Sequence, residues 1–225
     1  MKKIALLLLI QLPLLVAGMP DIVLDGTVFK GKTTYTYGLF DIATGEELVK
    51  TTVIVEVEGD VLVIDDSINE SFVTLKLPSM EPFYGEKTIH YNGDYIIQCQ
   101  FQGDSVIIDA TTPSGEENAV VEIPNRPLLH NDQLLFSLPA MNFTVEKQKF
   151  TMFIPANASF MTAAVVVKGK EKTQVPAGEF QTYKVALDFG SDVQYSYYNV
   201  NKPHTLVLYD NGRIQYRLES ITSEQ

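Results

Sequence analysis

Four short turn sequences constrain the fold of this chain more than any other feature. Each of them separates two runs in which apolar and polar residues alternate, and they are Glu58-Gly59-Asp60, Asn92-Gly93-Asp94, Gln102-Gly103-Asp104 and Asp210-Asn211-Gly212. Asn-Gly and Gly-Asp pairs tolerate the positive φ angles that tight β-turns require. Closely spaced turns of this kind are typical of up-and-down antiparallel sheets and barrels. We therefore predict an all-β fold, an antiparallel up-and-down sheet that closes into a barrel or half-barrel.

The segment Val175–Leu187 indicates a tight turn that leads into a long strand. Pro176 fixes its own φ angle, and Gly178 permits a sharp bend. From Tyr183 onward, every second residue is apolar, which predicts one face turned toward the core.

Helical and linker signals are few. The segment Leu128–Ser137 offers Asn131 or Asp132 as a helix cap, so we expect one or two helical turns or a loop there. The most linker-like segment is Thr111–Asn118. We interpret it as a long surface loop within a single domain, residues 19–225, and a break between two subdomains at 111–118 is the alternative.

Residues 1–18 have the pattern of a signal peptide. Lys2 and Lys3 precede an apolar stretch that ends in small residues acceptable to signal peptidase. The stretch is short for a bilayer crossing, which needs about 20 residues, and an uncleaved anchor is the alternative. Met19 stands where a lipoprotein would carry its modified cysteine. We expect a soluble, periplasmic or extracellular protein, cleaved close to Gly18, that is not a lipoprotein.

Charge and composition exclude several partners. Without Lys2 and Lys3, 15 Lys and Arg face 28 Asp and Glu, or −13. Such a surface repels nucleic acid, because phosphate binding requires a basic face. No later apolar run approaches membrane-spanning length, so we expect no transmembrane segment after signal cleavage. Cys99 is the only cysteine, so no internal disulfide can form, and the core must supply the stability.

The segment Val175-Pro-Ala-Gly-Glu-Phe-Gln-Thr-Tyr-Lys-Val185 contains a Val-Pro-Ala-Gly-x-Phe pattern in the C-terminal half of the chain. This pattern is similar to the signature of a family of exported bacterial proteins known as domain of unknown function 3108. The resemblance covers roughly residues 128–220, and its flanks include Leu134–Phe136, Tyr197-Tyr198, Pro203–Val207 and Asp210–Tyr216. It implies a β-rich, half-open barrel exposed to the periplasm or the cell surface. It implies no catalytic residue.

No metal or cofactor site is predicted. The three histidines, His90, His130 and His204, lack the spacing of a zinc site, so we interpret them as isolated surface or strand-end residues. The alternative is that they converge in space. Acidic and amide oxygens between Asp65 and Glu70 lack the pattern of a calcium loop, and a solvated turn explains them.

No catalytic residues are predicted either. Cys99 shares an apolar face with Tyr95, Ile97 and Phe101, where a cysteine acts as a small hydrophobe. The chain carries no nucleophile elbow, phosphate loop or dinucleotide fingerprint.

Tyrosines crowd the C-terminal part of the chain. A tyrosine joins an apolar body to a polar tip, which suits a binding groove and a packed core equally. If a groove exists, Tyr183, Tyr195 and Tyr197 are its candidate residues. Alternation places Tyr195 and Tyr197 on one face of their strand.

Two classes of function agree with these observations. The first is a non-catalytic binding module of the cell envelope, whose sheet holds an apolar or amphipathic ligand such as a lipid. The second is a structural or protein-interaction protein of the envelope with a filled core. An enzyme is a distant third, because no residue set meets the geometric requirements of a catalytic site.

Overall fold

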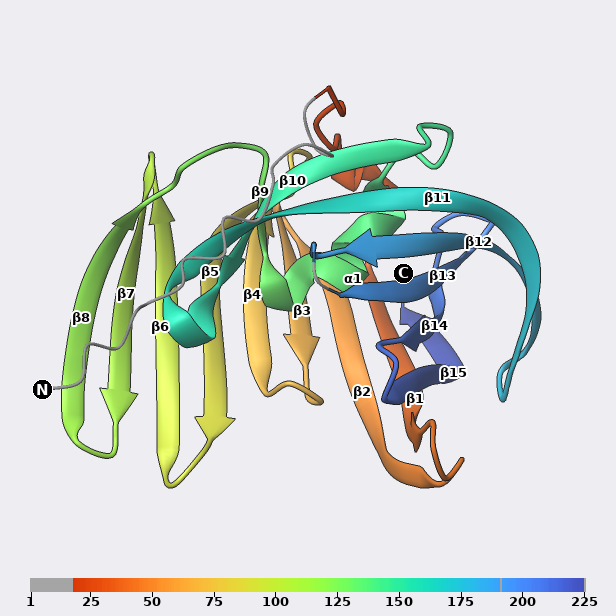
Figure 1. Cartoon of the computed structure of the whole chain (residues 1–225), viewed down its shortest axis with the longest axis horizontal. Helices are drawn as coiled ribbons and strands as arrows, with labels where there is room; N and C mark the ends of the chain where they lie inside the picture. Colours follow the sequence, from red (N-terminus) through yellow and green to blue (C-terminus); the bar gives the residue numbers. More distant parts are fainter. Residues whose placement is uncertain (1–17, 191, 225) are drawn as a thin grey trace, which may run out of the picture.

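The computed structural model describes residues 18–190 and 192–224. In this part of the chain, one sheet contains fifteen strands in the order β8-β7-β6-β5-β4-β3-β2-β1-β15-β14-β13-β12-β11-β10-β9 (Figure 1). The strands are β1 (Lys32–Asp41), β2 (Glu47–Glu58), β3 (Val61–Asp66), β4 (Ser71–Lys76), β5 (Glu81–His90), β6 (Asp94–Gln102), β7 (Ser105–Thr112), β8 (Gly115–Glu122), β9 (Leu128–His130), β10 (Lys147–Ile154), β11 (Ser159–Val175), β12 (Gly178–Asp188), β13 (Val193–Asn199), β14 (Leu206–Asp210) and β15 (Ile214–Glu224). The short helices are η2 (Gly26–Val28), η3 (Asn131–Gln133), α1 (Leu134–Ser137), η4 (Leu138–Ala140) and η5 (Pro155–Asn157).

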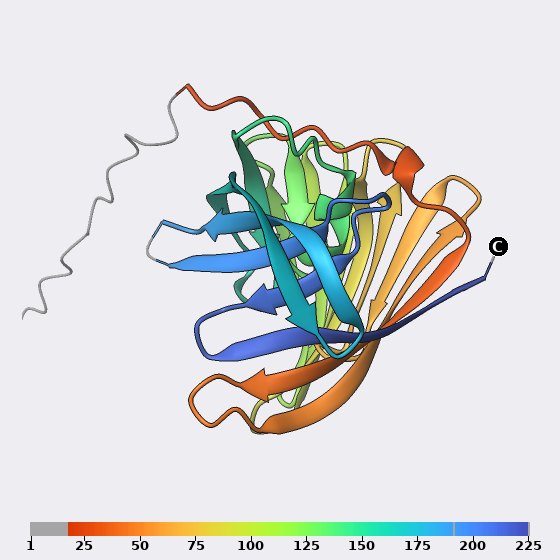
Figure 2. The ribbon, with the colours of Figure 1, turned by 90° about the vertical axis from the view of Figure 1, so that its right-hand side faces the viewer.

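Almost every strand pairs with its neighbours in the sequence, except that β8 and β9 do not pair with each other. In addition, β1 pairs with β15, which joins the first and last strands in the middle of the sheet. The pairing of β9 with β10 is parallel, and all the others are antiparallel. The sheet ends at β8 and β9 without a hydrogen-bonded closure, and it curls around its own interior (Figure 2). The predicted all-β antiparallel fold is confirmed in its half-barrel form.

The predicted turns lie between the predicted strands. All four Gly-containing sequences connect consecutive antiparallel strands, from β2 to β3, β5 to β6, β6 to β7, and β14 to β15. The turn at Pro176 connects β11 to β12, and Gly178 has a φ angle of +130°. An L side chain rarely adopts such a φ angle, so a glycine is required at this position.

The expected surface loop at Thr111–Asn118 is wrong. These residues form the tip of the β7–β8 hairpin, in which Thr112 pairs with Gly115 and only Pro113 and Ser114 lie outside the strands. The hydrogen-bonded ladder is therefore continuous through the segment proposed as a subdomain break. Nearly all of β8 is exposed, so its sequence lacks the alternation that reveals a strand.

The expected helical turns at Leu128–Ser137 are present as η3 and α1, after a three-residue strand. The cap, however, is neither Asn131 nor Asp132. The side chain of His130 accepts a hydrogen bond from the backbone N–H of Asp132, and Gln133 completes a capping box. α1 lies on the concave side of the sheet (Figure 1). Its Phe136 contacts two aromatic rings of β1.

The described residues form two apolar cores. The larger core lies in the body, which we define as β1–β4, β9–β15 and the short helices that precede and connect them. The smaller core lies under the wing, which we define as β5–β8, where Ile97, Cys99 and Phe101 of β6 meet Leu128 and Phe153 of the body. The predicted signal peptide lies outside the described residues except for Gly18. Within residues 18–190 and 192–224, no helix is both long and apolar enough to span a membrane.

Candidate functional site

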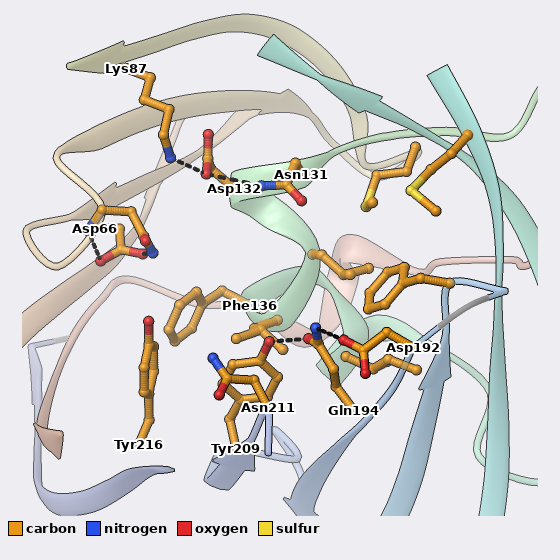
Figure 3. A pocket seen from close by; sticks show the side chains of 17 residues that line it. Asp66, Lys87, Asn131, Asp132, Phe136, Asp192, Gln194, Tyr209, Asn211 and Tyr216 are labelled. Atoms are coloured by element: carbon orange, nitrogen blue, oxygen red, sulfur yellow. Dashed lines mark hydrogen bonds and ion pairs between the residues drawn. The ribbon is translucent and has the colours of Figure 1, made fainter. Parts of the chain in front are cut away.

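A cavity of about 430 Å³ lies between α1 and the strands that curl around it (Figure 3). Its apolar lining residues, which we call the apolar wall, are Leu134, Leu135, Phe136, Met152, Met161, Leu187 and Phe189. Its polar lining residues, which we call the polar wall, are Asp66, Asn69, Lys87, Asn131, Asp132, Asp192, Gln194, Tyr209, Asn211 and Tyr216.

The apolar wall combines a helical turn with three strands. Tyr198 Oη of β13 donates a hydrogen bond of 3.0 Å to the carbonyl oxygen of Leu135, which fixes α1 against the sheet. Met152 and Met161 are register partners on β10 and β11. Methionine side chains are flexible and polarizable, so this part of the wall can adapt to an apolar ligand.

A buried ion pair forms one end of the polar wall. Lys87 Nζ of β5 lies 2.7 Å from Asp132 Oδ1, and Asn131 Nδ2 donates to the same oxygen at 3.3 Å. The Asp132 side chain is only 2% exposed. Its second oxygen, Oδ2, has no hydrogen-bond partner among the described residues. An isolated buried charge is unfavourable, so Lys87 is required to neutralise Asp132. Its charge is therefore not available to an anionic ligand.

His130 lies behind this ion pair and does not line the cavity. Its Nδ1 accepts the Asp132 N–H at 3.2 Å, which leaves the proton of the neutral ring on Nε2. Burial lowers the pKa of His130 to about 4, partly opposed by the charge of Asp132. The ring packs against Phe101 and Phe153 of the wing core, so its role is structural.

Asp66 forms a second anionic point in the polar wall. Its carboxylate accepts hydrogen bonds from Ile68 N at 2.8 Å, Asn69 N at 3.3 Å and Asn69 Nδ2 at 2.7 Å. No basic side chain of the described residues forms an ion pair with it. Burial raises the pKa of Asp66 above its ordinary value, against the lowering effect of these hydrogen bonds. The expectation of a solvated turn at this aspartate is therefore wrong.

The third part of the polar wall is a chain of side-chain hydrogen bonds. Tyr209 Oη donates to Gln194 Oε1, and Gln194 Nε2 donates to Asp192 Oδ2 at 2.9 Å (Figure 3). Burial raises the pKa of Tyr209, and it raises the pKa of Tyr216 to about 12. Both phenols are therefore neutral at physiological pH and can donate hydrogen bonds.

The chemistry of the cavity suits binding. Its described lining residues include no Ser, Thr, Cys or His, and no group of three potential metal ligands occurs in the part of the chain that the structure describes. The lining offers an apolar surface for a hydrocarbon segment. It also offers carboxylate, amide and phenol groups for a polar end.

The structure does not bring the three predicted groove tyrosines together. Tyr183 pairs with Tyr198 and faces the body core, where it stacks on Phe143 at 4.6 Å between ring centroids. Tyr195 and Tyr197 lie on the opposite face, where Lys184 Nζ lies 5.0 and 5.3 Å from their ring centroids. The pairing register of β12 and β13 decides this separation, and sequence alternation within one strand does not reveal it.

The histidines and the cysteine occupy separate places. His90 is exposed and bonds to Glu70 and Asp94, while His204 packs against Phe143. Cys99 is buried in the wing core, where burial raises the pKa of its thiol to about 12. Such a thiol is unreactive at physiological pH.

Comparisons with known proteins support the fold. No protein-family model matches the chain, and the search of curated proteins found no match. One similar solved structure is a beta-barrel-like protein of domain of unknown function DUF1849 from Brucella abortus, with a TM-score of 0.51 and 8% identity over 87% of this chain and 98% of that chain. Another, from Bacteroides fragilis, is described as exported and as having a YmcC-like fold. Its TM-score is 0.28, with 10% identity over 90% of this chain and 100% of that chain.

The Brucella structure places this chain in the class of beta-barrel-like folds. At 8% identity the likeness concerns the fold alone. The neighbour belongs to a different domain of unknown function, so the resemblance to family 3108 stays a prediction.

Proposed function

We propose that this is an exported protein of the cell envelope that binds an amphipathic ligand, such as a lipid, in the cavity beneath α1. Export is supported by the basic and apolar pattern of residues 1–18 and by the resemblance to family 3108. Binding is supported by one observation above all. A cavity of about 430 Å³ is lined by both apolar and polar side chains, and this volume lies within the roughly 300–1,000 Å³ typical of small-molecule sites.

The two walls suggest how the ligand is oriented. A hydrocarbon segment would lie along Met152, Met161 and Phe189, where it displaces water from apolar surface. The polar end would meet Asp66 and Gln194. Since Lys87 is already paired with Asp132, the wall favours a neutral or cationic end group that donates hydrogen bonds.

A titration with octyl glucoside below its critical micelle concentration tests the site. Met161→Trp places a large side chain in the cavity, and we expect it to weaken binding at least about tenfold in isothermal titration calorimetry. Thr162→Trp is the matched control, because the next residue of β11 is exposed. We expect its affinity to stay within about twofold of the wild type. Absent binding by the wild type, or equal binding by both variants, would exclude this cavity as the site.

The alternative is a protein-interaction role with no ligand in the interior. The observation that favours it is β8, an edge strand whose residues are almost all exposed and which includes Val120 at 68% exposure. Edge strands present unpaired backbone groups to other chains. The octyl glucoside titration distinguishes the two roles.

A further inference from the structure

A second hollow, of about 650 Å³, opens on another side of the body. It lies between η2, the start of β1, the end of β15 and the loop that connects β13 to β14. Figure 2 shows η2, the start of β1 and the C-terminal end of the chain on the same side of the molecule. Its apolar lining comes from Val28, Phe29, Tyr35, Val55 and Pro203.

A pair of aromatic rings separates this hollow from the cavity beneath α1. Tyr35 lines the second hollow and Phe136 lines the first, and the two rings stack with their centroids 6.4 Å apart. The two sites therefore share one core but have different lining residues. The inference that follows concerns the second hollow alone and goes beyond the proposed function.

Two lysines without partners line the second hollow. In residues 18–190 and 192–224, most basic side chains have an acidic or aromatic partner. Those for which the structure gives no such contact are Lys30, Lys147, Lys168, Lys202 and Arg213. Lys30 and Lys202 both line the hollow, although they lie far apart in the sequence. Two lysines without an acidic or aromatic partner thus line the same partly apolar hollow in a protein whose net charge is −11.

The acidic groups nearby do not neutralise these lysines by direct contact. Asp25 caps η2, and its Oδ1 accepts Thr27 N at 3.0 Å and Thr27 Oγ1 at 2.7 Å. These hydrogen bonds lower the pKa of Asp25, and the charges of Lys202 and Lys30 lower it further. Glu224 also lines the hollow. It helps to raise the pKa of Lys32, after the larger effect of the Lys32–Glu56 hydrogen bond.

We propose that the second hollow binds a single alkyl chain that ends in an anionic group. The chain would lie against Phe29, Tyr35 and Pro203, and the anionic group would lie between Lys30 and Lys202. A lysine ammonium is a compact charge with three hydrogen-bond donors, so it can bind a carboxylate, a sulfate or a phosphate without a fixed geometry. Apolar contact and charge are both required, because exposed charge pairs alone contribute little.

Calorimetric titration with dodecanoate at pH 8, below its critical micelle concentration, tests this proposal. The double variant Lys30→Gln/Lys202→Gln should bind dodecanoate at least about tenfold more weakly than the wild type. The matched control is Lys147→Gln/Lys168→Gln, which removes the same charge from lysines that do not line the hollow. Its affinity should stay within about twofold of the wild type. All four substitutions exchange one polar side chain for another, so we expect every variant to fold.

A second arm separates the two cavities. Met161→Trp should leave dodecanoate binding unchanged, and Ser223→Trp, which places a bulky side chain in the second hollow, should abolish it. Three results would overturn the proposal. They are no binding by the wild type, equal weakening in both lysine variants, and loss of binding in Met161→Trp alone. Octyl glucoside binding tests the cavity beneath α1, and dodecanoate binding tests the second hollow. A negative result in one titration therefore does not decide the function of the other site.

Discussion

The body and the wing are made of similar antiparallel strands but differ in how far their inner faces are covered. The described residues of the body contribute thirty buried side chains to one core, whereas the core under the wing has seven. The body curls around α1, so apolar residues meet from several directions. The wing is covered near β9 and β10, while its last strand is exposed. The burial of a strand is therefore decided by what its sheet encloses, in addition to its own alternation.

The seam between the two regions contains a buried polar cluster beside the apolar contacts of the wing core. Lys87 comes from the wing and Asp132 from the body, and His130 packs beside Gly85 of the wing. The cavity beneath α1 is consequently built by both regions, although nearly all of its lining belongs to the body. Three substitutions or titrations examine this contrast, from the largest expected effect to the smallest.

Phe136→Ala should have the largest effect. Phe136 lies in the body core and contacts Tyr35 and Tyr37 at centroid distances of 6.4 and 6.1 Å. Its truncation should lower the free energy of unfolding by about 3–5 kcal/mol, which urea denaturation measures. Phe101→Ala is the matched change in the wing, and we expect a smaller loss because the thinner core can close around the gap. The reverse order would contradict the contrast between the two cores.

Acidification should destabilise the seam through His130. Its pKa in the folded state is about 4, below the value of about 6.5 for an exposed histidine. Between these values the unfolded chain binds more protons, so stability is present above about pH 6.5 and is lost as the pH falls toward 4. The loss attributable to His130 should approach about 3 kcal/mol, at 1.36 kcal/mol for each pKa unit.

Urea denaturation at pH 7.5 and 4.5 measures this loss. The control is His130→Asn, which retains a capping acceptor but does not titrate. Asp66 acts in the opposite direction, because its raised pKa favours folding as the carboxyl becomes protonated, but it contributes equally to both proteins. An identical pH dependence in the two proteins would exclude His130 as the cause.

Gly85→Ala should have the smallest effect of the three. A Cβ atom at this position would lie 2.6 Å from His130 Nε2 and 3.0 Å from His130 Cδ2. The ring is buried and accepts the Asp132 N–H as the cap of η3, so it cannot move aside freely, and we expect a loss of about 1–3 kcal/mol. The same substitution in a His130→Ala background should have almost no further effect. An undiminished loss in that background would show that the strain arises elsewhere.

The sequence was informative where a single strand or turn carries the signal. The hairpin turns, the apolar face of Cys99 and the bend at Gly178 are local properties, and the structure confirms each of them. It was uninformative about β8, because a strand exposed on both faces has no buried side to impose alternation. The short helical turns η3 and α1 were expected, but the residue that caps η3 was not.

The candidate site could not be predicted because it depends on register between distant strands. Asp66, Asp132 and Gln194 come from β3, η3 and β13, and only the curl of the sheet brings them to one wall. The candidate groove tyrosines lie in a part of the chain that is rich in tyrosine. In the register of β12 and β13, Lys184 pairs with Tyr197, so Tyr195 and Tyr197 lie on the opposite face from Tyr183. A buried aspartate gives no signal in the sequence that distinguishes it from a solvated one.

The pairing of β1 with β15 has a consequence for the order in which the protein folds. Lys32 pairs with Glu224 and Tyr37 with Leu218, so the middle of the sheet joins residues from the two ends of the chain. The hairpins from β1 to β8 can form locally, but β1 keeps one edge unpaired until the final strand arrives. Contacts of such long sequence separation form slowly, because loop closure must come first. An open central edge is a template for incorrect pairing during that interval, so successful folding depends on the arrival of the last strand.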